Sequence, residues 1–210
     1  MSTTETPDRP APDPGPGPDG KTPWLMIAAA LVAIWVVFMV LTSPRGVDDL
    51  DGPGPGGSAA YDWTLKDLDG ADVTFDRFRG KALFVNVWAT WCPPCVAEMP
   101  SIARLAATPE LQGKVEFVCV SIDDGVNVLR SFLRGKDWPM TVLHADRLPP
   151  VFLTDGIPAT FFVAPDGRIA YKREGSAEWD SPEVVRKLQE LAERPARAAS
   201  APPATRPALR

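Results

Sequence analysis

The sequence predicts an α/β domain in which a mixed β-sheet is flanked by helices. Two apolar runs, at residues 82–88 and 115–121, have the composition of strands that are buried on both faces. A segment with helical spacing of apolar residues follows each run, and a β-hairpin and a last helix come after them. This order of elements is typical of a mixed sheet that helices cover.

Turn, capping and periodicity signals predict the other elements of this domain. Asp69-Gly70 indicates a hairpin between strands at 63–68 and 73–75. Ser181 is suited to cap the last helix, because Pro182 follows it in the first turn. The remaining expected elements are a helix from 93 to about 105, a helix at 125–134 with Val128, Leu129 and Phe132 facing inward, and strands at 141–143, 159–163 and 168–172.

Composition divides the 210-residue chain into one folded domain and flanking segments. Many of the 24 prolines lie in residues 1–23 and 195–210, which we expect to be extended tails with too little apolar surface to fold. Residues 42–60 are rich in Gly, Pro and Asp and are predicted to be a flexible linker. The folded domain is expected over 61–194. The formal net charge of -5, without a basic stripe in that domain, argues against a nucleic-acid partner.

Residues 24–41 form an uncharged apolar segment of 18 residues. As an α-helix this segment is about 27 Å long, which is enough to cross the hydrocarbon core of a bilayer. A buried core helix rarely lacks a polar face over this length, and a cleaved signal peptide has a shorter apolar core followed by a cleavage site. An uncleaved transmembrane anchor in the lipid bilayer is therefore predicted.

Basic residues near the apolar segment favour one orientation of the anchor. Arg9, Lys21 and the amino terminus precede the segment, and Arg45 follows it. By the positive-inside rule, the short N-terminal tail is expected inside the cell and the folded domain outside.

The motif Trp91-Cys92-Pro93-Pro94-Cys95 carries the clearest chemical signal. It follows the buried strand at 82–88 and opens a predicted helix. The unpaired N–H groups and the dipole at a helix start favour a negative charge, which shifts a cysteine there toward thiolate. The second cysteine lies on the same helical face, close enough to form a disulfide. This pattern predicts a redox-active dithiol that exchanges electrons with thiols of other proteins.

Two other interpretations of the cysteine pair are weaker. A zinc site needs two more ligands at suitable spacing, and the chain offers only Cys119 and His144. A purely structural disulfide across two residues would restrict the unfolded chain very little and would therefore stabilise weakly. No metal and no other cofactor are expected.

Two motifs together resemble a known fold. The segment 80–100, around the cysteine pair, resembles the thioredoxin fold and, more narrowly, the membrane-anchored TlpA/ResA group of thiol–disulfide oxidoreductases. Gly156-Ile157-Pro158-Ala159-Thr160 is similar to the second signature of that fold, a cis-proline loop that packs beside the dithiol and offers backbone groups to a substrate. The resemblance covers about residues 61–193. It implies a thioredoxin-like fold with an N-terminal hairpin and a central insert.

The spacing and chemistry of particular residues place the chain within this group. Pro158 comes 63 positions after Cys95, which fits the strand–helix insert of the anchored branch. Asn86 stands where many thioredoxins have a buried Asp, so that base is absent. Glu98 matches the acidic residue that the branch often carries after the second cysteine. Glu98 is expected either to exchange a proton with Cys95 or to be an exposed helix carboxylate.

The resemblance implies roles for the residues of the two motifs. Cys92 is expected to be the nucleophile, and Cys95, which is more buried, resolves the mixed disulfide. Trp91 is expected to shield the disulfide and contact substrate, or else to be partly buried at the strand end. The other residues expected to contact substrate are Pro93, Pro94, Ile157 and Pro158.

Three further residues are assigned to structure rather than chemistry. Trp88 is expected in the core, Cys119 as a small buried hydrophobic residue, and His144 in a loop. A copper site of the Sco type needs three residues between its cysteines, and peroxidase chemistry needs a different pattern from Thr90-Trp91-Cys92. Both are disfavoured.

Three functions are compatible with these expectations. The first is a reductase, anchored in the bacterial inner membrane and facing the periplasm, that takes electrons from a membrane-embedded donor and reduces protein disulfides, such as those met in cytochrome c maturation. The second is an oxidase or isomerase that uses the same residues in the opposite direction. The third is a non-catalytic thioredoxin-like module that binds a partner.

Overall fold

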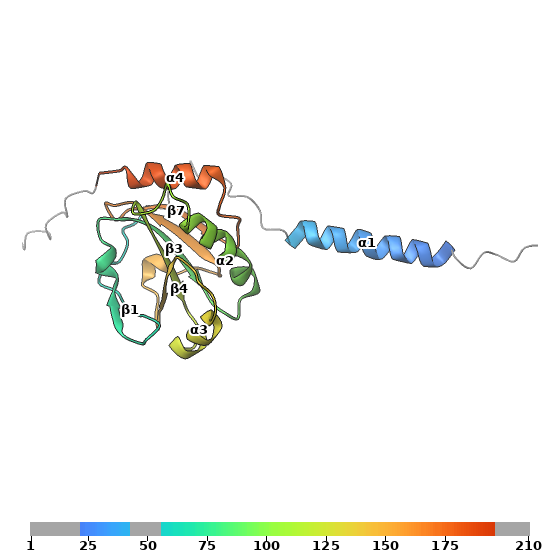
Figure 1. The fold of residues 1–210 in the computed structure, drawn as a ribbon, viewed down its shortest axis with the longest axis horizontal. Coiled ribbons are helices and arrows are strands. Elements are labelled where there is room, and N and C mark those ends of the chain that lie inside the picture. Colours follow the sequence, from blue (N-terminus) through green and yellow to red (C-terminus); the bar gives the residue numbers. More distant parts are fainter. Residues whose placement is uncertain (1–21, 43–55, 196–210) are drawn as a thin grey trace, which may run out of the picture. The chain divides into compact units, whose positions relative to one another are not determined.

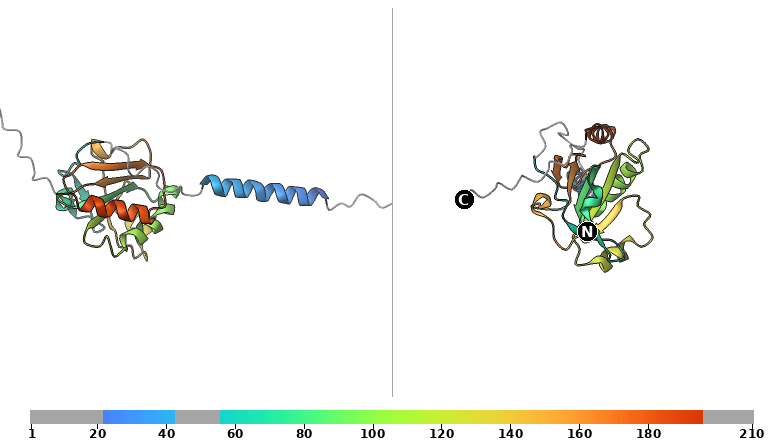
Figure 2. Two further views of the ribbon diagram at one scale, coloured as in Figure 1. Left: turned by 90° about the horizontal axis from the view of Figure 1, so that it is seen from above. Right: turned by 90° about the vertical axis from the view of Figure 1, so that its left-hand side faces the viewer.

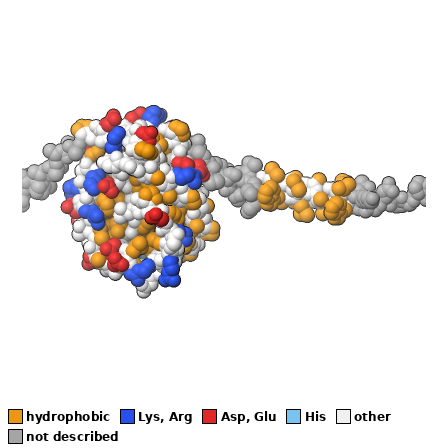
Figure 3. All heavy atoms as spheres, viewed as in Figure 1, with side chains coloured by type: hydrophobic (Ala, Val, Ile, Leu, Met, Phe, Trp, Pro, Cys, Tyr) orange, Lys and Arg blue, Asp and Glu red, His pale blue; other side chains and the backbone are white. Residues whose placement is uncertain are grey.

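A computed structural model describes residues 22–42 and 56–195, and it divides the chain into two compact units. The first unit contains helix α1, Thr22–Thr42, which includes the predicted apolar segment 24–41; its side chains are described from 24 to 37. Figure 3 shows apolar side chains along that part of α1, and most of them are exposed. Among the described residues, none of the helices meets the length and apolarity of a membrane span. The predicted tails and most of the predicted linker lie outside the described residues.

The second unit is built on one seven-stranded mixed sheet (Figure 1). The order of strands across the sheet is β2-β1-β5-β4-β3-β6-β7. Their bounds are β1 Thr64–Lys66, β2 Asp72–Thr74, β3 Ala82–Trp88, β4 Val115–Ser121, β5 Thr141–His144, β6 Ala159–Val163 and β7 Ile169–Glu174. Both predicted hairpins are confirmed, since β1 pairs with β2 and β6 pairs with β7 in antiparallel register.

Strand β3 is an interior strand of the sheet and leads into the cysteine pair. Every residue of β3 is buried, as its uninterrupted apolar composition predicts. It pairs in parallel with β4 on one side and antiparallel with β6 on the other. The strand therefore places its carboxyl end, at Trp88, beside the end of β4 and the start of β6.

Three helices, α2 (Pro93–Ala106), α3 (Val126–Leu133) and α4 (Pro182–Ala192), contribute buried side chains to one face of the sheet. Figure 2 shows α4 lying across that face. The segment before β1, with Ala59 and Tyr61, and two short 3-10 helices, η1 (Phe75–Phe78) and η2 (Pro150–Phe152), contribute buried side chains to the other face. The sheet is flanked by helices as predicted, but the second face is closed mainly by aromatic rings from these short segments.

Two expectations about individual residues are wrong. Val128 was expected to face inward from α3, but its side chain is 46% exposed, while Leu129 is buried. His144 was expected in a loop, but it is the last residue of β5 and is buried. Its ring Nε2 lies within hydrogen-bonding distance of the backbone carbonyl of Asp123, which follows β4. The residues next to His144 in the sequence do not predict this contact.

Candidate active site

The cysteine pair lies where β3 passes into α2. Strand β3 ends at Trp88, three residues form a turn, and α2 begins directly after Cys92. Cys92 is the N-cap residue, and its sulfur accepts a hydrogen bond from the Cys95 N–H at 3.3 Å. The two sulfurs form a disulfide, with the Cα atoms 5.3 Å apart. The predicted position of the pair, at a helix start after a buried strand, is therefore confirmed.

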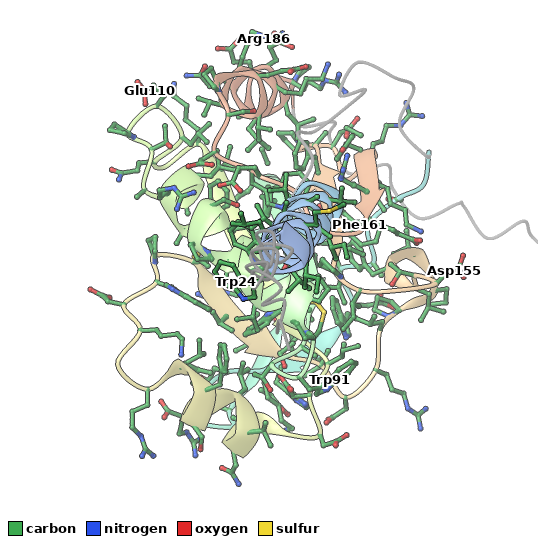
Figure 4. The ribbon with its side chains drawn as sticks, turned by 90° about the vertical axis from the view of Figure 1, so that its right-hand side faces the viewer. Trp24, Trp91, Glu110, Asp155, Phe161 and Arg186 are labelled. Atoms are coloured by element: carbon green, nitrogen blue, oxygen red, sulfur yellow. A yellow bond between two sulfur atoms is a disulfide. The ribbon has the colours of Figure 1, made fainter. Side chains whose placement is uncertain are left out.

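The two cysteines differ in exposure as the sequence predicts. Cys92 is 5% exposed, whereas Cys95 is fully buried by α2 and the sheet. Trp91 is 62% exposed beside them, so it is not buried at the strand end (Figure 4). Pro93 and Pro94 are exposed as well. A partner that reaches this surface meets an apolar rim around a single accessible sulfur.

The loop before β6 lies against the cysteine pair. The peptide bond between Ile157 and Pro158 is cis, as the resemblance implies. The Ile157 carbonyl oxygen is 3.8 Å from the Cys92 sulfur, although the two residues are 65 positions apart in the chain. Pro158 is buried, and its carbonyl accepts a hydrogen bond from the Gly175 N–H at 2.8 Å. The fold therefore brings the two predicted motifs together.

Glu98 lies on α2 and is fully buried, so its interpretation as an exposed helix carboxylate is wrong. One carboxylate oxygen accepts a hydrogen bond from the Asn86 side chain at 2.8 Å. The other accepts from the Ala177 N–H at 3.1 Å and from the Trp179 ring N–H at 3.0 Å. Three donors from β3 and from the segment after β7 thus converge on one carboxyl group.

Burial raises the pKa of the Glu98 carboxyl from 4.5 to about 7, because an ionised carboxylate loses its hydration in the core. The hydrogen bonds from Trp179, Asn86 and Ala177, and the charge of Arg173, act in the opposite direction and lower the pKa. A carboxyl group with a pKa near neutrality can hold or release a proton under physiological conditions.

Asn86 links Glu98 to β6, the strand that follows Pro158. Its side-chain amide also donates to the Thr160 hydroxyl at 3.0 Å, and Thr160 faces it across the β3–β6 pair. An amide in this position can donate to Glu98 but cannot itself accept a proton. The proton-carrying group of this buried cluster is therefore Glu98.

Cys119 confirms the prediction of an unreactive buried thiol. It lies in β4, is fully buried, and is the free cysteine of the described chain. Burial, and then the charge of Glu98, raise the pKa of the Cys119 thiol well above its ordinary value. The thiol therefore stays protonated, and thiolate chemistry is restricted to the pair on α2.

Two residues near the site have no signal in the sequence. Trp179 follows β7 by five residues, and only the packed structure places its ring N–H on Glu98. Asp123 follows β4, and its carboxylate binds Thr90 in the turn before Cys92. Both positions depend on contacts between segments that are far apart in the chain. Among the described residues, no group of three His, Cys, Asp or Glu side chains is placed to hold a metal ion.

Comparison with known proteins identifies the family. A model of the AhpC/TSA family matches residues 56–172, which include both cysteines, Glu98 and Pro158. The chain belongs to the AhpC/TSA family. The matched region contains the whole sheet except the last residues of β7, so the family resemblance covers the part of the fold that builds the site.

Relatives that match this chain are named thiol–disulfide oxidoreductases. The chain is 34% identical over 130 residues to "Thiol-disulfide oxidoreductase ResA" of Oceanobacillus iheyensis, covering 59% of this chain and 67% of that protein. It is 31% identical over 115 residues to the ResA of Geobacillus thermodenitrificans, covering 54% and 66% of the two chains. The chain thus spans about two thirds of the length of these relatives.

A solved structure of the MTB protein dsbF is similar as well, with 31% identity and a TM-score of 0.51. The match covers 62% of this chain and 96% of that one. The predicted thioredoxin-like fold is therefore confirmed. The predicted oxidoreductase class agrees with the named relatives and with the disulfide between Cys92 and Cys95.

Proposed function

We propose that this protein is a membrane-tethered thiol–disulfide oxidoreductase that reduces disulfides of extracytoplasmic proteins. The observation that carries the proposal is the Cys92–Cys95 disulfide at the start of α2, in which Cys92 is 5% exposed and Cys95 is fully buried. The ResA relatives support the same chemistry. The substrates are protein disulfides and thiols, which the exposed apolar rim around Cys92 is suited to contact.

The reducing reaction uses two electrons and two protons. The Cys92 thiolate attacks one sulfur of the client disulfide, a mixed disulfide forms, and the departing client thiolate takes up a proton. Cys95 then loses its proton, and its thiolate attacks the Cys92 sulfur. The second client thiolate leaves and is protonated. The client ends as a dithiol, and the enzyme ends with the Cys92–Cys95 disulfide.

Glu98 is the group that we assign to the proton of Cys95. It lies three residues after Cys95 on the same helix and is buried with it. With its pKa raised by burial to about 7, the ionised carboxylate accepts a proton from a thiol more readily than an ordinary glutamate does. The hydrogen bonds from Asn86 and Trp179 hold the carboxylate in place as it does so.

The direction of exchange is the first property to measure. The wild-type full-length chain is equilibrated with defined ratios of reduced and oxidised glutathione, and the fraction of dithiol is read by thiol alkylation and intact mass. We expect a midpoint near or below about -250 mV, in the range of reductants. A midpoint of about -120 to -180 mV would instead identify the oxidase or isomerase. Complete inertness of the pair would support the non-catalytic module.

The membrane anchor and the periplasmic location are part of the proposal. The uncharged segment 24–41, the helical conformation of α1 and the basic residues before it support a single-pass anchor in the bacterial inner membrane. We expect the full-length protein in the membrane fraction after alkaline carbonate washing, and reduced Cys92 in intact cells labelled by a membrane-impermeant thiol reagent. Recovery in the soluble fraction would contradict the anchor.

The client and the electron donor follow from this location. A periplasmic reductase needs electrons from the cytoplasm, so a membrane-embedded thiol donor is proposed to regenerate the dithiol. The proposed clients are disulfides of the cysteines to which haem is attached in cytochrome c maturation. Deletion of the gene is expected to lower the amount of haem-stained c-type cytochrome, and external dithiothreitol is expected to restore it. Normal cytochrome content in the deletion strain would rule out this client.

A further inference from the structure

A buried carboxylate lies beneath the turn that leads into the active site. Asp123 follows β4 and is 4% exposed. Its Oδ1 atom accepts hydrogen bonds from the Thr90 hydroxyl at 2.7 Å and from the Thr90 N–H at 3.1 Å. Its Oδ2 atom accepts from the Ser121 hydroxyl at 2.6 Å and lies 3.2 Å from the Thr90 nitrogen. Thr90 is two residues before Cys92.

The same turn is tied to β4 at a second point. The Trp88 carbonyl, at the end of β3, accepts a hydrogen bond from the Ile122 N–H at 2.9 Å. Asp123 is itself held, because its carbonyl oxygen lies 2.8 Å from the His144 ring Nε2 at the end of β5. The backbone between the end of β3 and the start of α2 is therefore held by hydrogen bonds from Ile122 and to Asp123.

Asp123 brings a negative charge to the turn in addition to its hydrogen bonds. The three donors that bind its carboxylate, the N–H and O–H of Thr90 and the O–H of Ser121, are all neutral. An asparagine side chain has the same shape and can also accept the Thr90 N–H, so the two side chains differ chiefly in the negative charge.

A negative charge near a dithiol acts on its redox equilibrium. It disfavours the thiolate of a neighbouring cysteine, because like charges in a poorly solvated site repel. The disulfide carries no charge and is unaffected. Where the thiolate is the populated reduced form, its destabilisation makes the dithiol a stronger reductant, so a carboxylate bound to the turn before Cys92 favours loss of electrons to a client.

Resting on the function proposed above, we propose that Asp123 is a positioning residue of the Cys92–Cys95 pair. Its carboxylate fixes the turn from Thr90 to Cys92, and its negative charge favours the disulfide over the dithiol. The Ser121 hydroxyl binds the carboxylate, and the His144 ring binds the backbone carbonyl of Asp123. The proposal assigns a function to the buried polar cluster between the ends of β3, β4 and β5.

The test compares Asp123→Asn with Asp124→Asn in the full-length chain. The first variant removes the buried charge and keeps the shape, and the second removes an exposed charge one residue away. Each is equilibrated with glutathione buffers, and the dithiol fraction is measured by alkylation and mass. For Asp123→Asn the equilibrium constant is expected to shift about tenfold toward the dithiol. For Asp124→Asn the shift is expected to be below about twofold, since solvent screens an exposed charge.

The positioning role is tested at Thr90. Thr90→Val removes the hydroxyl donor to Asp123 but keeps the shape and the N–H, and Thr90→Ser keeps the hydroxyl. With a small neutral disulfide as substrate, Thr90→Val is expected to lower the exchange rate about fivefold, because Cys92 is less well aligned. Thr90→Ser is expected to retain the wild-type rate. A Thr90→Ser variant as slow as Thr90→Val would contradict the role of this hydrogen bond.

Three outcomes at Asp123 would overturn the proposal. In the first, Asp123→Asn has the wild-type equilibrium constant. In the second, both asparagine variants shift it equally, which indicates a general surface-charge effect. In the third, Asp123→Asn lowers only the thermal unfolding midpoint. If the wild-type chain still exchanges thiols and disulfides in any of these cases, the proposed oxidoreductase function is retained. If the wild-type chain is inert, both that function and the role of Asp123 are refuted.

Discussion

The start of α2, around Cys92, and the buried cluster around Glu98 are both built from β3 and α2. Their surroundings are opposite. At the start of the helix, Trp91 is largely exposed and Cys92 is reached from the surface. In the cluster, Glu98, Asn86 and Thr160 are all buried and bound to one another or to Trp179. The exposed region carries the sulfur that contacts a client, and the buried region carries the proton.

The comparison shows that surroundings, and not residue type, decide reactivity here. Cys92 lies at a helix start, where the N–H of Cys95 points at its sulfur. Cys119 lies in the middle of β4 behind Glu98, where burial raises the pKa of its thiol. Glu98 gains a pKa near neutrality from the same burial. Low solvation suppresses the chemistry of the thiol and enables that of the carboxyl group.

The sharpest test of the comparison removes the exposed sulfur. Cys92→Ser is expected to reduce disulfide exchange to the uncatalysed rate, because no other thiolate reaches the surface. The loss is measured with a small-molecule disulfide at saturating reductant. Cys95→Ser is the matched control, in which Cys92 still attacks and the mixed disulfide accumulates on a gel. Full activity of Cys92→Ser would show that the roles of the two cysteines are wrongly assigned.

The next largest effect is expected at Glu98. Glu98→Gln keeps the size of the side chain but cannot take the proton of Cys95, so resolution of the mixed disulfide is expected to slow by about tenfold to a hundredfold. In the wild type this rate is expected to rise as the pH increases through about 7, where Glu98 ionises. In the variant that rise is absent. Stopped-flow measurement of mixed-disulfide decay between pH 5 and 9 distinguishes the wild type from the variant. Identical pH profiles would exclude Glu98 as the proton acceptor for Cys95.

Glu98 also predicts how stability depends on pH. Its folded pKa of about 7 lies above the unfolded value of 4.5, so the folded state binds more protons between these values. Stability contributed by protonated Glu98 is therefore lost as the pH rises through that window. Relative to Glu98→Gln, the wild type is expected to lose about 3 kcal/mol of unfolding free energy from pH 4.5 to 8. Urea denaturation at both pH values checks this, and a pH-independent difference would contradict the burial argument.

A smaller effect is expected from the donor that supports the carboxylate. Trp179→Phe removes the ring N–H that binds Glu98 and keeps most of the aromatic packing. Because that hydrogen bond stabilises the charged form, its loss is expected to raise the pKa of Glu98 by about one unit. The pH profile of mixed-disulfide decay then moves to higher pH. Trp138→Phe, at an aromatic contact of Trp88, is the control and should leave the profile in place.

The smallest effect on exchange is expected at the buried thiol. Cys119→Ala removes a sulfur that stays protonated, so the exchange rate is expected to be unchanged. The unfolding free energy is expected to fall by about 1 kcal/mol, because a small cavity is left in the core. Activity and urea denaturation are measured together. A loss of activity without loss of stability would show that Cys119 takes part in the chemistry.

Much of the fold was predictable because its signals are local. The composition of β3 and β4, the turn at Asp69-Gly70 and the N-cap at Ser181 each act through a few neighbouring residues. The prediction of which side chains are buried was wrong on the short helix α3, where apolar residues lie on more than one face. Val128 and Leu129 are both apolar neighbours on α3, and only packing against the sheet decides which of them is buried.

For the site, the sequence by itself determined the cysteine pair, its place at a helix start and the proline signature that lies beside it. These follow from residue types at fixed spacing and from the physics of a helix terminus. Only the tertiary structure decided that Glu98 is buried with three donors, that Trp179 is one of them, and that Asp123 reaches Thr90. The pKa of a carboxyl group depends on solvation and on partners from distant segments, and these exist only once the sheet and helices have packed.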